Sequence, residues 1–276
     1  MTIRSNVHTH TTWCDGTDTP RQMAEAALAL GFTDLGFSSH APAKFDPTCP
    51  GVASEADYQA DIAAVKAEYA GRLAVLCGIE QDACAPVNAA SYDYVIGSTH
   101  YLPLGNEYVA VDNSPEMLRL LQNEQYGSSS LAMATDFFTR TVAHTQRDKP
   151  TVVGHFDLIA KFNRTGAFFD EESAAYKRAA LDGMDALLDI VDSYGGLVEV
   201  NTGAMARGLR SVPYPAPFLL RHMAGRKARV IITSDSHQRT KLNAHFEQAQ
   251  ALLAQAGFRS MVVLQNGRFQ DVLLDA

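Results

Sequence analysis

The stretch IRSNVHTH, residues 3–10, shows the pattern from which the fold can be inferred. A short run that can form a β-strand is followed directly by His8 and His10. Because side chains alternate along an extended strand, residues two apart project to the same side. Two imidazoles placed in this way can bind one metal ion. The end of the first predicted strand is therefore the first candidate site.

Short apolar runs recur along the rest of the chain, with helical segments between them. This alternation is expected of parallel βαβ units, so the sequence predicts an α/β fold built as a barrel or a wound sheet. Seven strands are predicted, over residues 3–7, 33–38, 73–79, 92–98, 151–154, 196–200 and 229–233.

Helix signals fill the gaps between these strands. Pro20 after Asp18-Thr19, Ser54 before Glu55, and Pro115 after Ser114 mark three helix starts. Residues 101–150 form an insertion much longer than a standard connection, with an extra helix predicted around 131–143 and a break at 127–130. We expect this insertion to wall a site, and we expect Asn266-Gly267 to turn a terminal hairpin.

Bulk composition limits the classes of protein that need to be considered. The chain has 276 residues, of which 46% are hydrophobic and 20% charged, which is typical of one globular domain over 1–276. The net charge of −8 argues against a broad nucleic-acid-binding surface. No apolar run is long enough for a membrane span, and the start lacks a signal peptide, so we predict a cytoplasmic protein with no membrane partner. The four cysteines show no metal-binding or disulfide spacing and are expected to be free thiols.

Residues that bind metals follow nearly every predicted strand. Carboxyl ends of barrel strands converge on one face, so residues far apart in sequence are expected to meet there. A lone histidine at a strand end is usually structural, but six of nine histidines in this position favour a metal cluster. The predicted ligands are His8, His10, Asp15, His40, Glu80, His100, His155, Asp235 and His237.

The chemistry of these side chains narrows the choice of metal. Nitrogen and oxygen donors without thiolate favour zinc, manganese or iron over calcium or copper. Glu80 and Asp235 can each share two carboxylate oxygens between ions. We therefore expect two to three divalent metal ions.

Several motifs resemble those of the polymerase and histidinol phosphatase (PHP) superfamily, and within it the histidinol-phosphate phosphatases. They are VHTHTTWCDG, FSSHAP, GIEQD, GSTHYL, GHFDLIAKF, VEVNTGAMARG and ITSDSHQ, which span nearly the whole chain. The resemblance implies a single-domain, distorted (β/α)7 barrel and hydrolysis of L-histidinol phosphate to L-histidinol and phosphate, a step of histidine biosynthesis. It also implies three metal sites, formed by His8, His10, Glu80 and Asp235, by Glu80, His100 and His155, and by Asp15, His40 and His237.

Hydrolysis of a phosphate monoester needs a strong nucleophile and neutralised phosphoryl charge. A hydroxide bridging two metal ions is expected to supply the nucleophile. His237, beside Asp235, is the predicted acid for the leaving oxygen, and these two residues are the predicted catalytic pair. The cations predicted to bind phosphate are Arg207 first, then Arg164, Lys161 and Arg210.

Two other enzymatic functions remain open at this point. A phosphodiesterase or exonuclease of the same superfamily would need an open basic groove, which the sequence does not indicate. An amidohydrolase also begins with His-x-His, but His40 and the Asp-x-His ending fit a phosphoesterase better. A non-enzymatic metal-binding scaffold would be expected to have lost ligands, and all nine are present. The predicted partner is a small phosphate ester rather than a nucleic acid.

Overall fold

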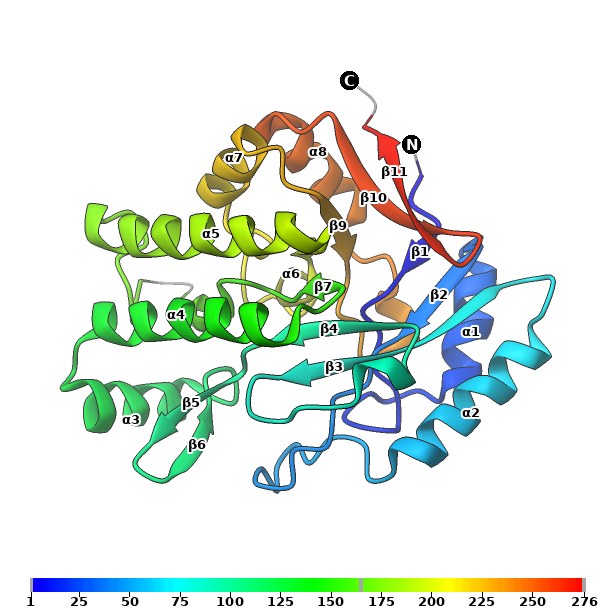
Figure 1. The fold of residues 1–276 in the computed structure, drawn as a ribbon, viewed down its shortest axis with the longest axis horizontal. Helices are drawn as coiled ribbons and strands as arrows, with labels where there is room; N and C mark the ends of the chain where they lie inside the picture. The colour runs from blue at the N-terminus through cyan, green and yellow to red at the C-terminus, as the bar shows by residue number, and fades with distance from the viewer. Residues whose placement is uncertain (1, 164–165, 275–276) are drawn as a thin grey trace.

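The centre of the molecule is a curved sheet of parallel strands (Figure 1). The computed structural model describes residues 2–163 and 166–274. Within them, each of the seven predicted strands is present, and each pairs in parallel with the next. The predicted α/β fold is confirmed. In sheet order the strands are β1 (Ser5–Asn6), β2 (Asp34–Phe37), β3 (Ala74–Asp82), β4 (Tyr94–Ser98), β7 (Val152–Val153), β8 (Leu197–Asn201) and β9 (Val230–Thr233).

The first and seventh of these strands meet at their carboxyl ends. His10 N–H donates to the Ser236 carbonyl at 2.8 Å, and Ser236 N–H donates to the His8 carbonyl at 3.1 Å, which makes a parallel bridge between Thr9 and Ser236. At the opposite end, β10 (Ser260–Gln265) pairs with β9 instead. An isolated bridge therefore joins the segments after β1 and β9 where the predicted site lies, whereas the sheet continues into β10 at the opposite end.

Apolar side chains fill the interior beneath that bridge. Tyr94 is buried there, and its hydroxyl donates to the carbonyls of Val7 at 2.5 Å and Phe37 at 3.0 Å. A Cβ on Gly36 or Gly78 would lie within 2.4 Å of the Tyr94 side chain, so the two glycines leave room for the ring. This packed floor separates the site from the amino end of the barrel.

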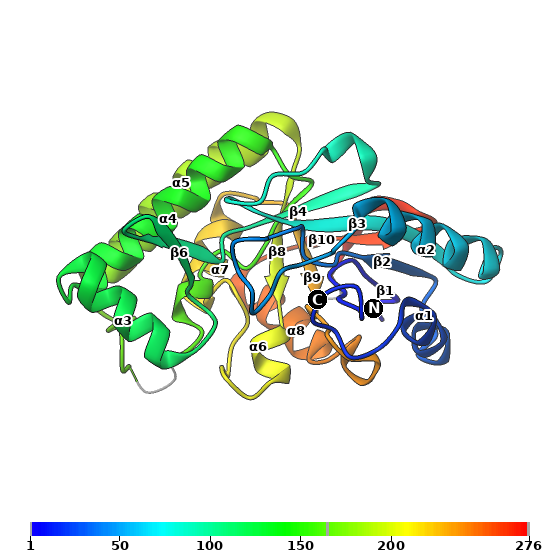
Figure 2. The ribbon, with the colours of Figure 1, turned by 90° about the horizontal axis from the view of Figure 1, so that it is seen from below.

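Helices cover the outside of the sheet, and α4 and α5 lie side by side on the flank opposite α1 and α2 (Figures 1 and 2). The predicted helix starts are confirmed, because Thr19, Ser54 and Ser114 each accept a backbone N–H as N-caps. The helices are α1 (Pro20–Ala29), α2 (Glu55–Glu68), α3 (Pro115–Tyr126), α4 (Ser130–Asp148), α5 (Ala174–Tyr194), α6 (Gly203–Ala206), α7 (Pro217–Gly225) and α8 (Phe246–Ala256).

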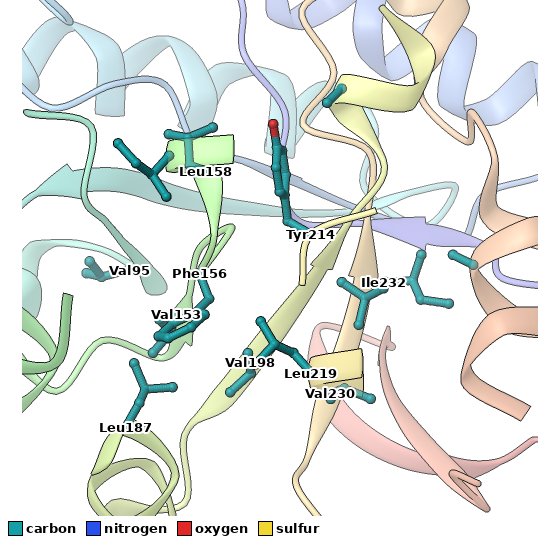
Figure 3. Close-up of a cluster of buried hydrophobic side chains, with 14 of the residues drawn as sticks. Val95, Val153, Phe156, Leu158, Leu187, Val198, Tyr214, Leu219, Val230 and Ile232 are labelled. Carbon is teal, nitrogen blue, oxygen red and sulfur yellow. The ribbon is translucent and has the colours of Figure 1, made fainter. Parts of the chain in front are cut away.

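A second apolar core lies between the strands and these helices (Figure 3). Val153, Val198 and Val230 point outward from three neighbouring strands, toward Leu187 of α5 and Leu219 of α7. All five side chains are buried. This layer fixes the direction in which the carboxyl ends of the strands present their polar residues.

The predicted insertion after His100 contains more structure than was expected. Besides α3 and α4 it forms an antiparallel hairpin, β5 (Tyr101–Leu104) and β6 (Glu107–Ala110), which was not predicted. The predicted break falls between the two helices, where Gly127 ends α3 with φ 54° and Ser129 caps α4.

The predicted terminal hairpin is also present. Asn266 and Gly267, with φ 53° and 71°, join β10 to β11 (Arg268–Leu273) in the geometry expected of an Asn-Gly turn. Among the residues that the structure describes, no helix is both long and apolar enough to cross a membrane.

Candidate metal centre

All nine predicted ligands lie together at the carboxyl end of the barrel. Most of them follow or end a strand, and Asp15 comes from the loop after β1. That loop is tight because Cys14 and Gly16 N–H both donate to the Thr11 carbonyl, and a Cβ on Gly16 would lie 2.5 Å from Thr11 N. Asp235 has φ 47°, a left-handed conformation that an aspartate tolerates and that is often found at functional sites.

One group of donors surrounds the deepest point of the site. His8 Nε2 and His10 Nε2 lie 3.3 and 3.4 Å from Glu80 Oε2, and 3.6 and 3.2 Å from Asp235 Oδ1. These four residues are the first predicted metal site. Their side chains are almost wholly buried.

The other carboxylate oxygen of Glu80 borders a second group. His155 Nε2 lies 3.0 Å and His100 Nε2 3.5 Å from Glu80 Oε1. The donor atoms that lie close enough to share an ion group His155 with His8 and Glu80, and His100 with His40 and Glu80. His40 also contacts Glu80, through Nδ1 at 3.0 Å from Oε2. Glu80 is thus central to the cluster and has the position expected of a bridging carboxylate.

The third predicted group is nearer the surface. His237 Nε2 lies 3.1 Å from Asp15 Oδ2, and His40 Nε2 lies 3.7 Å from Asp15 Oδ1. His10 belongs to this group as well, because its Nδ1 is 3.7 Å from the same carboxylate. His10 and His40 therefore each contact both Glu80 and Asp15, although the predicted sites assign them to separate groups.

Buried atoms without partners indicate that the donor set fits metal ions. His8 Nε2, His10 Nε2 and Glu80 Oε2 are inaccessible to solvent and have no hydrogen-bond partner. Buried polar atoms are rarely left in this state, since each lost hydrogen bond carries a desolvation penalty. The three atoms point at one another, and with Asp235 they offer the nitrogen and oxygen ligands of a zinc, manganese or iron site.

The pKa shifts of three predicted ligands favour the form that binds metal. Burial lowers the pKa of His10 to about 3, helped by the nearby His237 and His40, so its imidazole is neutral at pH 7. Burial alone would raise the pKa of Glu80, but the surrounding histidines, His8 first, hold it well below its usual range. Burial alone would also raise the pKa of Asp235. Nearby positive groups, Arg207 first, instead lower the pKa of that carboxyl well below its usual range. Burial opposes protonation of His8, His40 and His100, but the nearby carboxylates raise the pKa of these three histidines.

A cavity of about 440 Å³ opens above the cluster. Its walls include Tyr101, Asp112 and Asn113 from the insertion. Ala43 and Asp46, from the loop after β2, also line it. The volume suits a small molecule.

Of the four cations predicted to bind phosphate, two line this cavity. Arg207 donates to Asp235 Oδ2 at 3.1 Å, and Lys161 Nζ donates to Asp112 Oδ2 at 2.9 Å. Arg210 does not line the cavity. It donates to Glu171 and to the Ala160 carbonyl, so the structure gives it a packing role instead of a role in the site. Arg164 lies outside the described residues.

Glu199 is the functional residue that sequence reasoning missed. It lies in the middle of β8, is fully buried, and accepts a hydrogen bond from His8 Nδ1 at 2.5 Å. The prediction had left this strand without a ligand and connected it to the site only through Arg207. A carboxylate within the apolar run LVEV was a signal, because an acidic residue in a buried strand needs a partner.

The fold and the donor set together are those of an α/β protein that binds metal ions at the carboxyl end of a barrel. The chain matches the model of the PHP domain over residues 6–203, and it belongs to that family. The predicted superfamily membership is therefore confirmed.

Known proteins resemble the chain over most of its length. It is 29% identical over 273 residues to a probable histidinol-phosphatase of Deinococcus radiodurans. That match covers 95% of this chain and 96% of the relative. It is 27% identical over 261 residues to a histidinol-phosphatase of Bacillus subtilis, covering 84% and 92%. A crystal structure of histidinol phosphate phosphatase from Lactococcus lactis, complexed with zinc, L-histidinol and phosphate, has a TM-score of 0.70 at 18% identity and covers 96% of this chain and 98% of that one.

Proposed function

We propose that this protein is a metal-dependent phosphate monoester hydrolase that converts L-histidinol phosphate to L-histidinol and phosphate. The observation that carries the proposal is the buried set of unpartnered donors, His8 Nε2, His10 Nε2 and Glu80 Oε2, at the base of a cavity of small-molecule size. Similarity to histidinol-phosphatases over nearly the whole chain supports the choice of substrate.

The nine predicted ligands would hold two to three divalent ions. When bound, such ions lower the pKa of water and neutralise charge on a phosphoryl group. The protein itself places two cations beside this position. Arg207 offers a planar fork to two phosphate oxygens, and Lys161 offers a point charge from the neighbouring wall.

His237 is suitably placed to donate a proton to the leaving oxygen. Its side chain is about one quarter exposed and lines the cavity. Its Nδ1 faces the Asp235 carbonyl at 3.0 Å, and its Nε2 faces Asp15. A proton on Nε2 would therefore be held at the mouth of the site, within reach of a bound ester.

The rest of the cavity suits a substrate with a cationic alcohol part. Asp46 and Asp112 line it outside the predicted metal groups. Tyr101 donates to Asp46 at 2.8 Å and so holds that carboxylate in the wall. An amino alcohol carries its ammonium group a few bonds from the ester oxygen, and acidic side chains at this distance from the metal centre favour it over a neutral alcohol.

The test is a substrate panel. Purified protein loaded with manganese, zinc or iron is assayed against L-histidinol phosphate, generic phosphate monoesters and phosphodiesters. We expect kcat/KM for L-histidinol phosphate to exceed that of the generic monoesters by at least about 100-fold, because charged groups in the cavity discriminate strongly. A His237→Gln protein is assayed in parallel with its metal content measured, and it should lose kcat even when it is fully loaded with metal.

Two results would contradict the proposal. Equal turnover of all monoesters would remove the histidinol assignment and leave the phosphatase chemistry. Preference for diesters would favour the phosphodiesterase alternative instead. Full activity of His237→Gln would exclude His237 as the acid.

A further inference from the structure

Glu199 connects two of the predicted ligands from a position behind them. Its Oε1 accepts from His8 Nδ1 and from the Thr233 hydroxyl, both at 2.5 Å. Its Oε2 accepts from the His155 backbone N–H at 2.7 Å and from the Asn201 side-chain amide at 3.0 Å. The carboxylate has no solvent exposure and does not line the cavity.

The bond to His8 fixes which ring nitrogen is free. With Nδ1 donating to Glu199, the lone pair of His8 Nε2 points at Glu80 and Asp235, where that nitrogen has no other partner. A neutral imidazole has one donor and one acceptor nitrogen, so the carboxylate selects the tautomer that a metal needs. The ring is also held in its rotation.

The other carboxylate oxygen of Glu199, Oε2, binds a residue that follows a different strand. The His155 backbone N–H is anchored to Glu199, and the His155 ring reaches forward to lie 3.0 Å from Glu80 Oε1. One buried carboxylate in β8 thus sets the positions of a ligand from β1 and a ligand after β7. These two ligands contact different carboxylate oxygens of Glu80 and belong to the first and second predicted metal groups.

We propose that Glu199 is a positioning residue for the metal centre, which sets the tautomer of His8 and the backbone position of His155 so that two metal groups keep their spacing around Glu80. This inference rests on the proposed metal-binding role of those residues. Glu199 itself touches neither the cavity nor a bound substrate.

The experiment compares Glu199→Gln with Asp34→Asn. Glutamine keeps the size of the side chain, but it replaces one of the two accepting oxygens by an NH2 group. That NH2 group would face another hydrogen-bond donor. Asp34 is an equally buried carboxylate in β2, far from the cluster along the strand, and it accepts from Gly267 N at 2.6 Å. Both variants lose an acceptor in the barrel, and only one of them touches the ligands.

We expect Glu199→Gln to bind zinc or manganese about 10- to 100-fold more weakly, as is usual when the partner of a ligating histidine is lost. Metal dissociation constants are measured by competition with a chelator, and thermal unfolding is followed on the metal-free proteins. Asp34→Asn should unfold at a lower temperature and keep wild-type metal affinity. In Glu199→Gln, kcat should fall while KM changes little, and excess metal should restore part of the activity.

Unchanged metal affinity in a folded Glu199→Gln protein would overturn the inference, as would an equal loss of affinity in Asp34→Asn. If Glu199→Gln does not fold, Thr233→Val decides, because it removes one donor to Glu199 and leaves the carboxylate in place. Wild-type metal affinity in Thr233→Val would then overturn it, and a several-fold loss would support it. Metal affinity is measured without substrate. The result can therefore be interpreted even if L-histidinol phosphate is not the substrate.

Discussion

Two arginines three residues apart in the sequence have different surroundings. Arg207 lies in the cavity wall beside Asp235, and Gly203 leaves it space, since a Cβ there would lie 2.9 Å from Arg207 Nη2. Arg210 is buried against Glu171 and the Ala160 carbonyl. Both were predicted to bind phosphate, and only Arg207 is placed to do so.

Replacing each arginine by methionine should separate these roles. Arg207→Met is expected to lower kcat/KM for a phosphate monoester by about 100-fold or more, because a fixed cation facing the phosphoryl charge is lost. Arg210→Met should leave kcat/KM within a few-fold of wild type and lower the free energy of unfolding by about 1–3 kcal/mol, because Glu171 loses a charged partner. Steady-state kinetics and urea unfolding measure the two effects. Equal catalytic losses in both variants would contradict this assignment.

The ligands that were predicted from the sequence and the one residue that was missed differ in where they lie relative to the predicted strands. His8, His100 and His155 follow strands directly, and parallel strands carry such positions to one edge, so their meeting could be predicted. Glu80 lies two residues before the end of β3, but the strand predicted there ended at residue 79. Glu199 lies equally far before the end of β8 and falls inside the predicted strand over 196–200, where the same reasoning expects a packed side chain. Two of its partners come from the neighbouring strands β7 and β9, but His8 follows β1, and only the bridge between Thr9 and Ser236 at the end of the sheet brings it within reach.

At the scale of the elements, the contact between α4 and α5 is closest at Gly183. A Cβ on Gly183 would lie 2.9 Å from Phe138 Cβ and 3.4 Å from the end of the Phe156 ring. The rings of Phe138 and Phe156 are stacked with their centroids 5.0 Å apart, and both are buried. The glycine therefore allows the insertion helix to approach the barrel. The sequence predicted the helix around 131–143 but not this contact, which depends on the packing of side chains from three segments.

A pair of glycine substitutions tests this packing. Alanine is favoured over glycine inside a helix by about 1 kcal/mol, so helix propensity alone would stabilise either variant. Gly225, in α7, has open space around its Cβ position, and Gly225→Ala should be neutral or slightly stabilising. Gly183→Ala should instead lower the free energy of unfolding by about 1–3 kcal/mol, as overpacked cores do. Urea unfolding measures the free energy of unfolding of both variants. A stabilised Gly183→Ala protein would show that α4 and α5 can move apart at this position without loss of stability.

At the scale of the whole molecule, the barrel has an apolar floor and a charged carboxyl end. Tyr94 and its apolar neighbours close the interior below, while Glu80, Asp235 and Glu199 are buried together above it. Three carboxylates are buried close together here, where solvent cannot reach them, and bound cations would interact strongly with their charge. The carboxyl end of the barrel is therefore the region in which bound cations should matter most for stability.

Metal removal should accordingly destabilise the whole protein. A ligand that binds only the folded state at 1,000 times its dissociation constant stabilises it by about 4 kcal/mol. For a chain of this length, that corresponds to a fall in Tm of roughly 10 °C when the ions are removed. The packed floor and the outer core should still keep the metal-free protein folded at 25 °C. Calorimetry before and after chelation measures the change, and reloading with zinc should reverse it. Asp34→Asn keeps all the metal donors, so its Tm should start lower and fall by the same amount on chelation. An unchanged Tm of the wild-type protein on chelation would mean that the cluster binds no ion tightly.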